Sequence, residues 1–420
     1  MLRPEPQHSP TERLAGYVAP MSQIVDSTLL ADAQGLLLDA VKLRRHLHRH
    51  PELGLTLPTT RQSVMESLDD LNLDIQQHHT TSGIAAVIDG GHDGPTVLLR
   101  ADMDALPLHE DADIEFRSAT EGSMHACGHD LHTAMLAGAA RLLHARRGDI
   151  HGRVLLMFQP GEEGHHGARY MLDEGLLDNV GTVSRAFALH VSTAVPTGIV
   201  ATRAGSIMAS SDVLKITVKG RGGHASSPHY ALDPIPVACE IVQALQMMIT
   251  RRIDVFDPSV VTVSQITAGT TDNVIPPTAT LIGTIRAVSE RTRTQVHDGI
   301  RRVSEGIAAA HECEVEVSIV SGFPVTVNDD HVSAEVLTLA SGLLGPKQVV
   351  QMPNPVMGSE DFSYVLQRVP GAMAFLGATP PGVNPFTAAP NHSNLVRFDE
   401  NAMPTGMALY AAYALEQLAG

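Results

Sequence analysis

Cysteine is scarce in this sequence. The 420 residues include three cysteines, Cys127, Cys239 and Cys313. An odd and sparse set in a chain of this length does not form the disulfide framework of a small secreted domain. The count therefore favours a reducing compartment, and we expect a cytoplasmic protein.

Long apolar runs and an excess of basic residues are also missing. No run approaches the roughly 18 apolar residues of a membrane helix, and residues 1–20 hold no apolar core of signal-peptide length. We expect residues 1–20 to form a polar, flexible tail. The formal net charge of -17 argues against a duplex-binding face, which must be basic. We therefore expect neither a nucleic-acid nor a membrane partner.

Familiar catalytic motifs are absent as well. The sequence has no G-x-S-x-G elbow, which argues against a serine hydrolase. It also lacks the H-E-x-x-H zinc motif and the phosphate-binding loop G-x-x-x-x-G-K-[ST]. Any catalytic chemistry must therefore rest on another arrangement of residues.

The length and the hydrophobic pattern predict an α/β protein with two domains. Single cores rarely grow beyond about 250–300 residues. Helical spacing predicts helices over residues 29–47 and 60–71, and apolar runs bounded by Gly and Pro predict strands at TSGIAAVIDG and TVLLRADMDAL. A helix at HDLHTAMLAGAARLLHARR, a strand at RVLLMFQP, a helix near 168–177 and a strand at AFALHV follow. This alternation predicts a mostly parallel sheet covered on both faces.

A different order of elements begins near Ser211. The segments VLKITVKG, IPVACEIVQALQMMI, VVTVSQITAG, ATLIGTIRAV, residues 291–311 and EVEVSIVSG predict the order β-α-β-β-α-β. This is the ferredoxin-like arrangement. We expect a domain over 211–321 that is inserted into a first domain made of 1–210 plus 322–420.

Residues that can bind metal follow the predicted strands of the first domain. In open α/β sheets, ligands bind beyond the carboxyl ends of the strands. Thiolate and imidazole suit zinc and other transition metals, and adjacent glutamates allow one to bind metal while the other takes a proton from water. Five separate segments supply Asp102, Asp104, Cys127, His129, Asp130, Glu162, Glu163, His190 and His392.

Each of these residues also has an ordinary structural explanation. An aspartate at a strand end is often a helix cap, and this explains Asp102 or Asp104 alone about equally well. A lone cysteine is usually a small buried hydrophobe, and His190 alone is best explained as a hydrogen-bonded core histidine. Paired glutamates are usually solvated, yet here they follow an apolar strand and a Pro-Gly turn. The combination favours a metal site.

Nine segments resemble those of one enzyme family. In chain order they are RRHLHRHPELG, LLRADMDALPL, MHACGHDLHTAMLAGAA, QPGEEGHHGARYMLDEGLL, ALHV, GRGGHASSPH, DNVIPPTATLIGTIR, MGSEDFSYV and NHSNL. They resemble the amidohydrolase branch of the co-catalytic metallopeptidases, which includes hippurate hydrolase and auxin-conjugate hydrolases. The resemblance runs from about residue 44 to the C-terminus, and its specificity lies in the number and order of the segments.

The resemblance implies two divalent metal ions, and Zn, Mn, Co and Ni all suit such ligands. It implies Glu162 as the general base and acid, and Asp104 as a buried acid that orients the metal site. Cys127 stands where distant relatives have a bridging aspartate. The implied metal ligands are Cys127, His129, Glu163, His190 and His392.

The resemblance also implies roles for residues of the second half. His224 matches a histidine that approaches the scissile carbonyl, often from a partner subunit, and a turn histidine is the alternative explanation. Asn273 and Arg286 match residues that bind the substrate carboxylate, although an exposed strand arginine is the ordinary explanation of Arg286. The backbone at Gly358 is expected to approach the substrate. The inserted domain is expected to form a homodimer and to close the site as a lid.

The implied function is hydrolysis of the amide bond of a small-molecule substrate, an N-acyl amino acid such as an N-acetyl or N-benzoyl conjugate. A dipeptidase or aminopeptidase on the same scaffold is one alternative. A non-catalytic metal-binding protein is another, although Glu162 argues against it. Three departures bear on substrate preference: LTLPTTR lacks a further glutamate, Gly161 replaces an alanine, and His165 and His166 stand where Pro or Gly is common. A solvated loop explains the two histidines more simply than a metal contact, and Glu360 has no assigned role.

Overall fold

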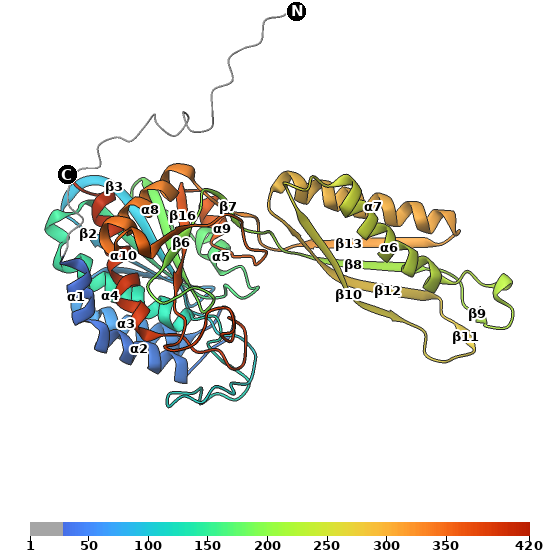
Figure 1. Cartoon of the computed structure of the whole chain (residues 1–420), viewed down its shortest axis with the longest axis horizontal. Helices are drawn as coiled ribbons and strands as arrows, with labels where there is room; N and C mark the ends of the chain where they lie inside the picture. Colours follow the sequence, from blue (N-terminus) through green and yellow to red (C-terminus); the bar gives the residue numbers. More distant parts are fainter. Residues whose placement is uncertain (1–27) are drawn as a thin grey trace, which may run out of the picture.

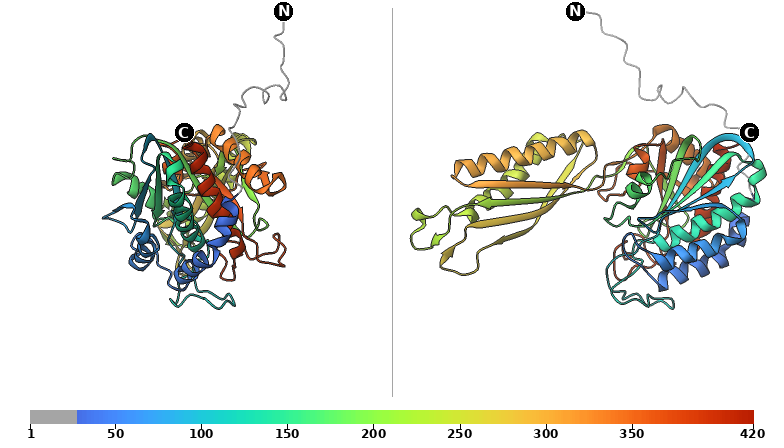
Figure 2. Two further views of the ribbon diagram at one scale, coloured as in Figure 1. Left: turned by 90° about the vertical axis from the view of Figure 1, so that its left-hand side faces the viewer. Right: turned by 180° about the vertical axis from the view of Figure 1, so that it is seen from behind.

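A computed structural model describes residues 28–420 of the chain. The ribbon separates into two bodies that are joined by two adjacent segments of chain (Figures 1 and 2). One body holds the elements before residue 209 and after residue 325, and the other holds those of residues 212–321. The tail expected at residues 1–20 lies outside the described residues.

The larger body is built on one eight-stranded sheet. Its four central strands, β4, β3, β5 and β16, are parallel, whereas β1, β2 and β6 join antiparallel neighbours. Beyond their first residues the central strands are almost fully buried, as expected where helices cover both faces. The prediction of an α/β fold with a mostly parallel sheet is therefore confirmed. In sheet order the strands are β1 (Asp74–Gln77), β2 (Ile84–Asp89), β4 (His151–Gln159), β3 (His92–Asp102), β5 (Val183–Ser192), β16 (Gly371–Gly377), β6 (Val200–Thr202) and β15 (Val349–Gln351).

Two apolar cores cover the two faces of this sheet. Because side chains alternate along a strand, Val97 and Leu99 of β3 enter the larger core and Leu98 enters the smaller one. Helices α5 (Gly167–Asp173) and α9 (Ser363–Leu366) pack in the smaller core. The larger core is covered by α1 (Leu29–Gly35), α2 (Leu37–Arg49), α3 (Pro58–Leu68), α4 (His129–Ala145), α8 (Asp330–Leu344) and α10 (Met403–Gln417).

The prediction of a single helix over residues 29–47 is wrong in one respect. The structure has two helices, α1 and α2, with a break at Leu36. Gly35 ends the first helix, where glycine weakens helix propagation, and the amide of Leu36 bonds to the carbonyls of Asp32 and Ala33. Short 3-10 turns lie at η1 (Asp69–Leu71), η2 (Arg147–Asp149), η3 (Pro228–Tyr230), η4 (Pro346–Gln348) and η5 (Glu400–Ala402). Within residues 28–420, no helix combines the length and apolar character needed to cross a membrane.

The main elements of the smaller body follow the order β-α-β-β-α-β. Its antiparallel sheet has the order β10-β12-β8-β13, with both helices on one face (Figure 1). The helix starts are set by side-chain caps, since Asp233 accepts from the amide of Ile235 and Ser289 from that of Thr292. The elements are β8 (Asp212–Lys219), α6 (Pro234–Arg252), β10 (Ser259–Ala268), β12 (Thr278–Ala287), α7 (Glu290–Ala310) and β13 (Glu314–Ser321).

Three further pairs of segments complete the fold. The short pair β9 (Gly223–His224) and β11 (Val274–Ile275) lies at the end of the smaller body that is distant from the larger one (Figures 1 and 2). The pair β7 (Gly205–Met208) and β14 (Thr326–Asn328) lies where the chain leaves and re-enters the larger body. Next to it, the amide of Ser211 donates to the carbonyl of Phe323 at 3.0 Å. This bond pairs the two connecting segments directly.

Helices α4 and α10 interlock through reciprocal contacts between glycine and methionine. A β-carbon at Gly138 of α4 would lie 2.1 Å from Sδ of Met407, and one at Gly406 of α10 would lie 2.2 Å from Sδ of Met135. Each methionine therefore fills the space that the opposite glycine leaves. This close approach holds α10 against the helix whose N-terminus carries His129.

We expect Gly138→Val to destabilise the protein by about 2 kcal/mol, because the added carbon atoms overpack the α4–α10 contact. Gly306→Ala on α7 is the matched control, since a β-carbon there meets no atom within 4 Å, and we expect it to stabilise by about 0.5–1 kcal/mol. Thermal unfolding of both variants measures the difference. An unchanged midpoint in Gly138→Val would contradict the interlocked packing.

Candidate functional site

The carboxyl ends of three parallel strands gather the candidate residues at one edge of the sheet. Asp102 ends β3 opposite Gln159 at the end of β4, and His190 lies near the end of β5. Asp104 and the glutamate pair follow β3 and β4 by a few residues. Cys127 and His129 come from the start of α4, and His392 from the loop before α10. The residues converge because the carboxyl ends of parallel strands lie at the same edge of a sheet.

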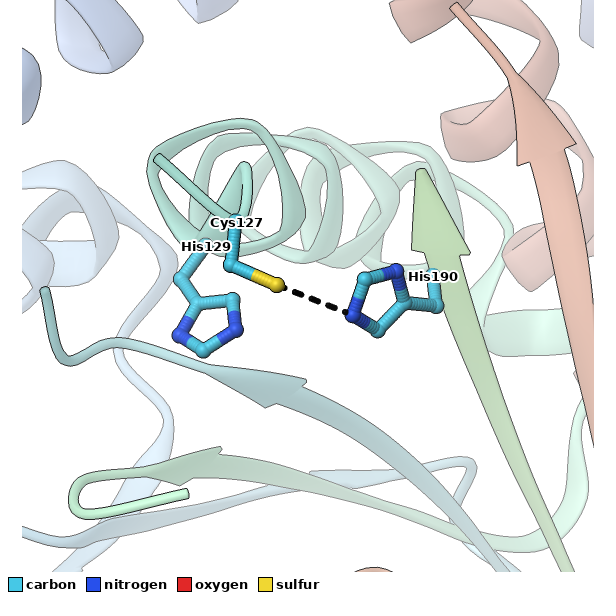
Figure 3. A group of neighbouring side chains, drawn as sticks. All are labelled: Cys127, His129 and His190. Atoms are coloured by element: carbon cyan, nitrogen blue, oxygen red, sulfur yellow. Dashed lines mark hydrogen bonds between the residues drawn. The ribbon is translucent and has the colours of Figure 1, made fainter. Parts of the chain in front are cut away.

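All five residues predicted as metal ligands lie in overlapping groups that form one cluster. Figure 3 shows three of them, Cys127, His129 and His190. Sγ of Cys127 lies 3.4 Å from Nε2 of His190 and 3.2 Å from Nε2 of His392. Oε1 of Glu163 lies 3.2 Å from Nε2 of His392 and 4.0 Å from Nε2 of His129. The five side chains thus present one thiol sulfur, three ring nitrogens and a carboxylate to a common space.

Backbone hydrogen bonds fix how two of the imidazoles face this space. Nδ1 of His129 lies 2.8 Å from the carbonyl oxygen of Asp104, and Nδ1 of His190 lies 2.9 Å from that of Val191. Because a carbonyl only accepts, each Nδ1 carries a proton, and Nε2 is the ring nitrogen that faces the cluster. Nε2 of His129 and Oε1 of Glu163 are buried without a hydrogen-bond partner among the described residues. Such unsatisfied atoms, next to a thiol, fit a metal ion.

Asp104 holds the backbone of the glutamate pair. Its Oδ1 accepts from the amide of Glu162 at 2.9 Å, and its Oδ2 accepts from the amide of Glu163 at 3.0 Å. Gly161 makes the turn before the pair at φ +69, where glycine is favoured. Asp104 therefore positions both glutamates and, through its carbonyl, His129.

The pKa values show that the site concentrates negative charge. Burial raises the pKa of Glu163 to about 7, and the nearby thiolate of Cys127 adds to this rise. Burial and the surrounding carboxylates raise the pKa of Glu162 well above its usual range. Burial alone would raise the pKa of the Cys127 thiol, but the surrounding imidazoles, His190 foremost, hold it well below its usual range. Bound cations would stabilise the ionised form of all three groups.

Sequence reasoning missed a buried network centred on Arg100. Its guanidinium contacts Oδ2 of Asp102 at 2.7 Å, Oε1 of Glu360 at 2.8 Å and Oδ1 of Asp361 at 3.2 Å, and its Nε donates to Gln159 at 2.8 Å. All of these side chains are buried. The helix-cap explanation of Asp102 is therefore wrong, and Glu360 belongs to this network. The available signal in the sequence was a single arginine, Arg100, within an otherwise apolar strand, because a buried arginine needs acidic partners.

His132 is a second residue that the sequence did not single out. Its Nδ1 donates to Oδ1 of Asp102 at 2.6 Å, and its Nε2 accepts from the amide of Val191 at 2.7 Å. Both ring nitrogens are thus occupied, so His132 holds the end of β5 beside His190 and leaves no lone pair for a metal. Asp130, the neighbour of His129, instead accepts from Nδ1 of His48 at 2.8 Å and forms an ion pair with Arg44, whose Nε lies 2.8 Å away.

A cavity of about 920 Å³ opens from the cluster and reaches the smaller body. Its lining includes Cys127, Glu162 and His392 on one side and Arg286 of β12 on the other. Nη1 of Arg286 donates to Oγ of Ser359 at 3.0 Å, and the neighbouring Gly358 also lines the cavity. The structure therefore places the two predicted substrate-binding positions Arg286 and Gly358 in the same cavity as the cluster.

The structure does not bring His224 and Asn273 to this cavity. Both lie at the far end of the smaller body, where His224 pairs with Val274 and the carbonyl of Asn273 accepts from the amide of Ala225 at 3.0 Å. Nδ1 of His224 accepts from the amide of Ser226 at 3.1 Å. Both side chains are exposed. Within one chain they form a separate surface, and their predicted roles need a second copy.

We expect Arg100→Met to cost about 3–5 kcal/mol of stability, because it leaves buried carboxylates without their cation. Arg153→Met is the matched control, since Arg153 pairs with Asp89 at 2.9 Å with both side chains substantially exposed, and such pairs contribute about 0–1 kcal/mol. Chemical denaturation of both variants tests this. Equal losses in the two variants would contradict the central role of Arg100.

Comparison with known proteins agrees with this geometry. The model of peptidase family M20/M25/M40 matches residues 98–416. Thermostable carboxypeptidase 2 of Saccharolobus solfataricus is 38% identical over 90% of this chain and 94% of its own length. IAA-amino acid hydrolase ILR1-like 2 of Arabidopsis thaliana is 39% identical over 90% of this chain and 85% of its own length.

A solved structure supports the same assignment. The Bacillus subtilis YXEP protein, described as a dinuclear metal binding peptidase of the M20 family, is 32% identical with a TM-score of 0.80. The match covers 92% of this chain and 99% of that protein. From the matched family model, the identities and the shared fold, this chain belongs to peptidase family M20/M25/M40.

Proposed function

We propose that this protein hydrolyses the amide bond of N-acyl amino acids and releases a carboxylic acid and a free amino acid. The observation that carries the proposal is the adjacent pair Glu162 and Glu163 beside the thiol–imidazole cluster. Oε1 of the half-buried Glu163 lies 3.2 Å from Nε2 of His392, whereas Oε2 of the buried Glu162 lies 4.0 Å from Nε2 of His129. A ligand beside an uncoordinated carboxylate suits hydrolysis, since one acid binds metal and the other moves protons. A relative named for hydrolysis of IAA-amino acids supports the acyl-amino-acid class.

We propose that the cluster holds two divalent cations, with Zn, Mn, Co or Ni as the candidate metals. When bound, such ions lower the pKa of water towards about 7 and polarise the carbonyl under attack. Cys127 lies between His190 and His392, so its thiolate would hold metal together with these two imidazoles. Asp104 keeps His129 and the glutamate pair in place for them.

Glu162 is proposed to move the proton during the reaction. It takes a proton from the attacking water and returns it to the nitrogen of the leaving amine. Its side chain is buried, and Oε2 lies 4.0 Å from Nε2 of His129. Burial and nearby carboxylates raise its pKa, and a raised pKa suits a group that must accept a proton and then give it back.

Charge in the cavity favours a substrate with a free carboxylate and a blocked amine. Arg286 is proposed to bind the carboxylate in the two-pronged manner of a guanidinium, while the backbone at Gly358 approaches the substrate. Among the described lining residues the carboxylates are Glu162, Glu163 and Asp212. Asp212 is already bonded to Arg293 and to His297. No lining carboxylate is therefore left for a free α-ammonium group, which argues against an aminopeptidase.

The smaller body is proposed to serve as a dimerisation and lid domain over residues 211–321. In a homodimer, His224 and Asn273 would reach the cavity of the partner subunit, His224 to donate to the developing oxyanion and Asn273 to bind the carboxylate end. Support comes from their exposure at the tip, where His224 already uses Nδ1 and leaves Nε2 available.

Carboxypeptidase activity is the second candidate. A relative that is 38% identical is named a thermostable carboxypeptidase, and cleavage of a C-terminal residue also needs a free carboxylate and an acylated nitrogen. The two activities differ in what lies on the acyl side of the bond. The size of the acyl group that the enzyme accepts therefore separates them.

We expect metal-loaded protein to cleave N-acetyl amino acids and N-benzoylglycine faster than the free dipeptide glycyl-leucine, because the free amine finds no anionic partner. An N-acetylated dipeptide tests the carboxypeptidase candidate. Release of free amino acid, followed by an amine-reactive dye, measures each rate. Faster cleavage of the free dipeptide would contradict the proposal, and preference for the acetylated dipeptide would favour carboxypeptidase activity.

We expect Glu162→Gln to keep its metal but to lose about 10²–10⁴-fold in kcat, because the amide cannot accept the proton. Glu163→Gln is expected instead to lower the metal content. Glu305→Gln, an exposed position on α7, is the control and should change neither quantity. Metal analysis and initial rates on one acyl amino acid measure both effects, and wild-type turnover in Glu162→Gln would exclude its role.

A further inference from the structure

His166 adopts a backbone conformation that is unfavourable for a residue with a β-carbon. It lies at φ 59 and ψ 38, in the left-handed region that favours glycine, immediately before α5. A residue with a β-carbon pays a free-energy cost there, and such positions persist when their surroundings hold them. The position is three residues after Glu163, on the loop that carries the glutamate pair.

Two contacts hold the imidazole of His166. Its Nδ1 lies 2.9 Å from the hydroxyl of Tyr364, which in turn lies 3.4 Å from the carbonyl oxygen of Gly322. The ring meets that of Phe323 edge to face, with centroids 4.9 Å apart and planes at 89°. If Nδ1–H donates to the hydroxyl and the hydroxyl donates to Gly322, every donor has an acceptor and Nε2 keeps a lone pair. Burial lowers the pKa of His166, so the ring is neutral near pH 7.

The held ring forms part of the cavity wall. His166, Phe323, Met208 and Met357 all line the cavity that contains the metal cluster. Nε2 of His166 makes no hydrogen bond within the described residues and is not among their buried unpaired atoms, so it is open to solvent. Aromatic rings and thioethers make favourable contacts with aromatic groups. This wall therefore suits a planar apolar group better than a charged one.

Backbone hydrogen bonds connect Phe323 of the wall to the segment beside Arg286. Phe323 accepts from the amide of Ser211 at 3.0 Å, and the adjacent Ser210 donates to the carbonyl of Ala287, the neighbour of Arg286, at 2.8 Å. A substrate with its carboxylate at Arg286 and its amide at the metal cluster has its α-carbon between the two. The acyl group lies beyond the amide, so the side chain is the part of such a substrate nearer to Arg286 and to the segment that holds Phe323.

We propose that His166, together with Phe323, forms the subsite for the side chain of the released amino acid and favours aromatic side chains there. This inference rests on the proposed amidohydrolase function. His166 acts as a specificity-determining residue, with Tyr364 as the positioning residue that fixes its ring. A purely structural anchor would affect all substrates alike, so discrimination between side chains separates the two roles.

His166→Gly removes the ring at a backbone position that suits glycine, so the variant should fold. We expect its kcat/KM for N-acetyl-L-phenylalanine to fall about tenfold, which corresponds to about 1.4 kcal/mol. Its kcat/KM for N-acetyl-L-alanine should stay within about twofold, since that side chain gains little from an aromatic contact. Tyr364→Phe, which keeps the phenyl ring, should show a smaller selective loss. His165→Ala is the control on the same loop and should leave both values unchanged.

Three results would overturn the inference. Equal losses on both substrates would show a structural anchor, and no loss would show that the ring does not contact the substrate. A selective loss on N-benzoylglycine, without one on N-acetyl-L-phenylalanine, would place the acyl group at the wall instead.

A binding measurement separates failure of this inference from failure of the proposed function. Calorimetry with metal-loaded Glu162→Gln measures the Kd of both N-acetyl amino acids with and without His166→Gly. Loss of the preference for N-acetyl-L-phenylalanine in the double variant would support the subsite even if the parent protein hydrolysed neither compound. Equal binding of the two compounds by Glu162→Gln itself would reject the subsite.

Discussion

Crowded negative charge at the carboxyl edge of the large sheet is the constraint on which the rest of the structure depends. Asp102, Glu360 and Asp361 are buried around the single guanidinium of Arg100, and Glu162 lies within the same group of carboxylates. Burying like charges is costly unless a cation compensates them. Arg100 compensates the inner half of this region, and the proposed divalent metal ions of this metal-dependent amidohydrolase would compensate the outer half.

Local patterns in the sequence predicted much of the fold, whereas the set of five metal ligands was implied by the family resemblance. Parallel strand order explains why most of these residues meet, since they lie at strand ends or at the start of α4, but His392 comes from a loop. The Arg100 network could not be predicted in this way, because Arg100 and Glu360 are 260 residues apart and Glu360 stands in no regular element. The break between α1 and α2 at Leu36 was not predicted, because the helical spacing of apolar residues continues through it.

The division into two bodies explains why some predicted residues gather and others do not. Arg286 lies near the root of the smaller body and lines the cavity, whereas His224 and Asn273 lie at its tip. A family resemblance shows which positions of this chain correspond to functional residues of relatives. It does not show which copy of the chain supplies each residue to a given site. The sequence could therefore mark these positions without showing where they act.

The interlocked α4 and α10 have a consequence for the order in which the protein folds. Cys127 and His129 stand at the start of α4, whereas His392 lies in the loop that precedes α10. Cys127 and His392 are 265 residues apart in the chain, and contacts of large sequence separation form slowly because closing a long loop costs conformational entropy. Assembly of the proposed ligand set is therefore a late step of folding, which follows docking of α10 on α4.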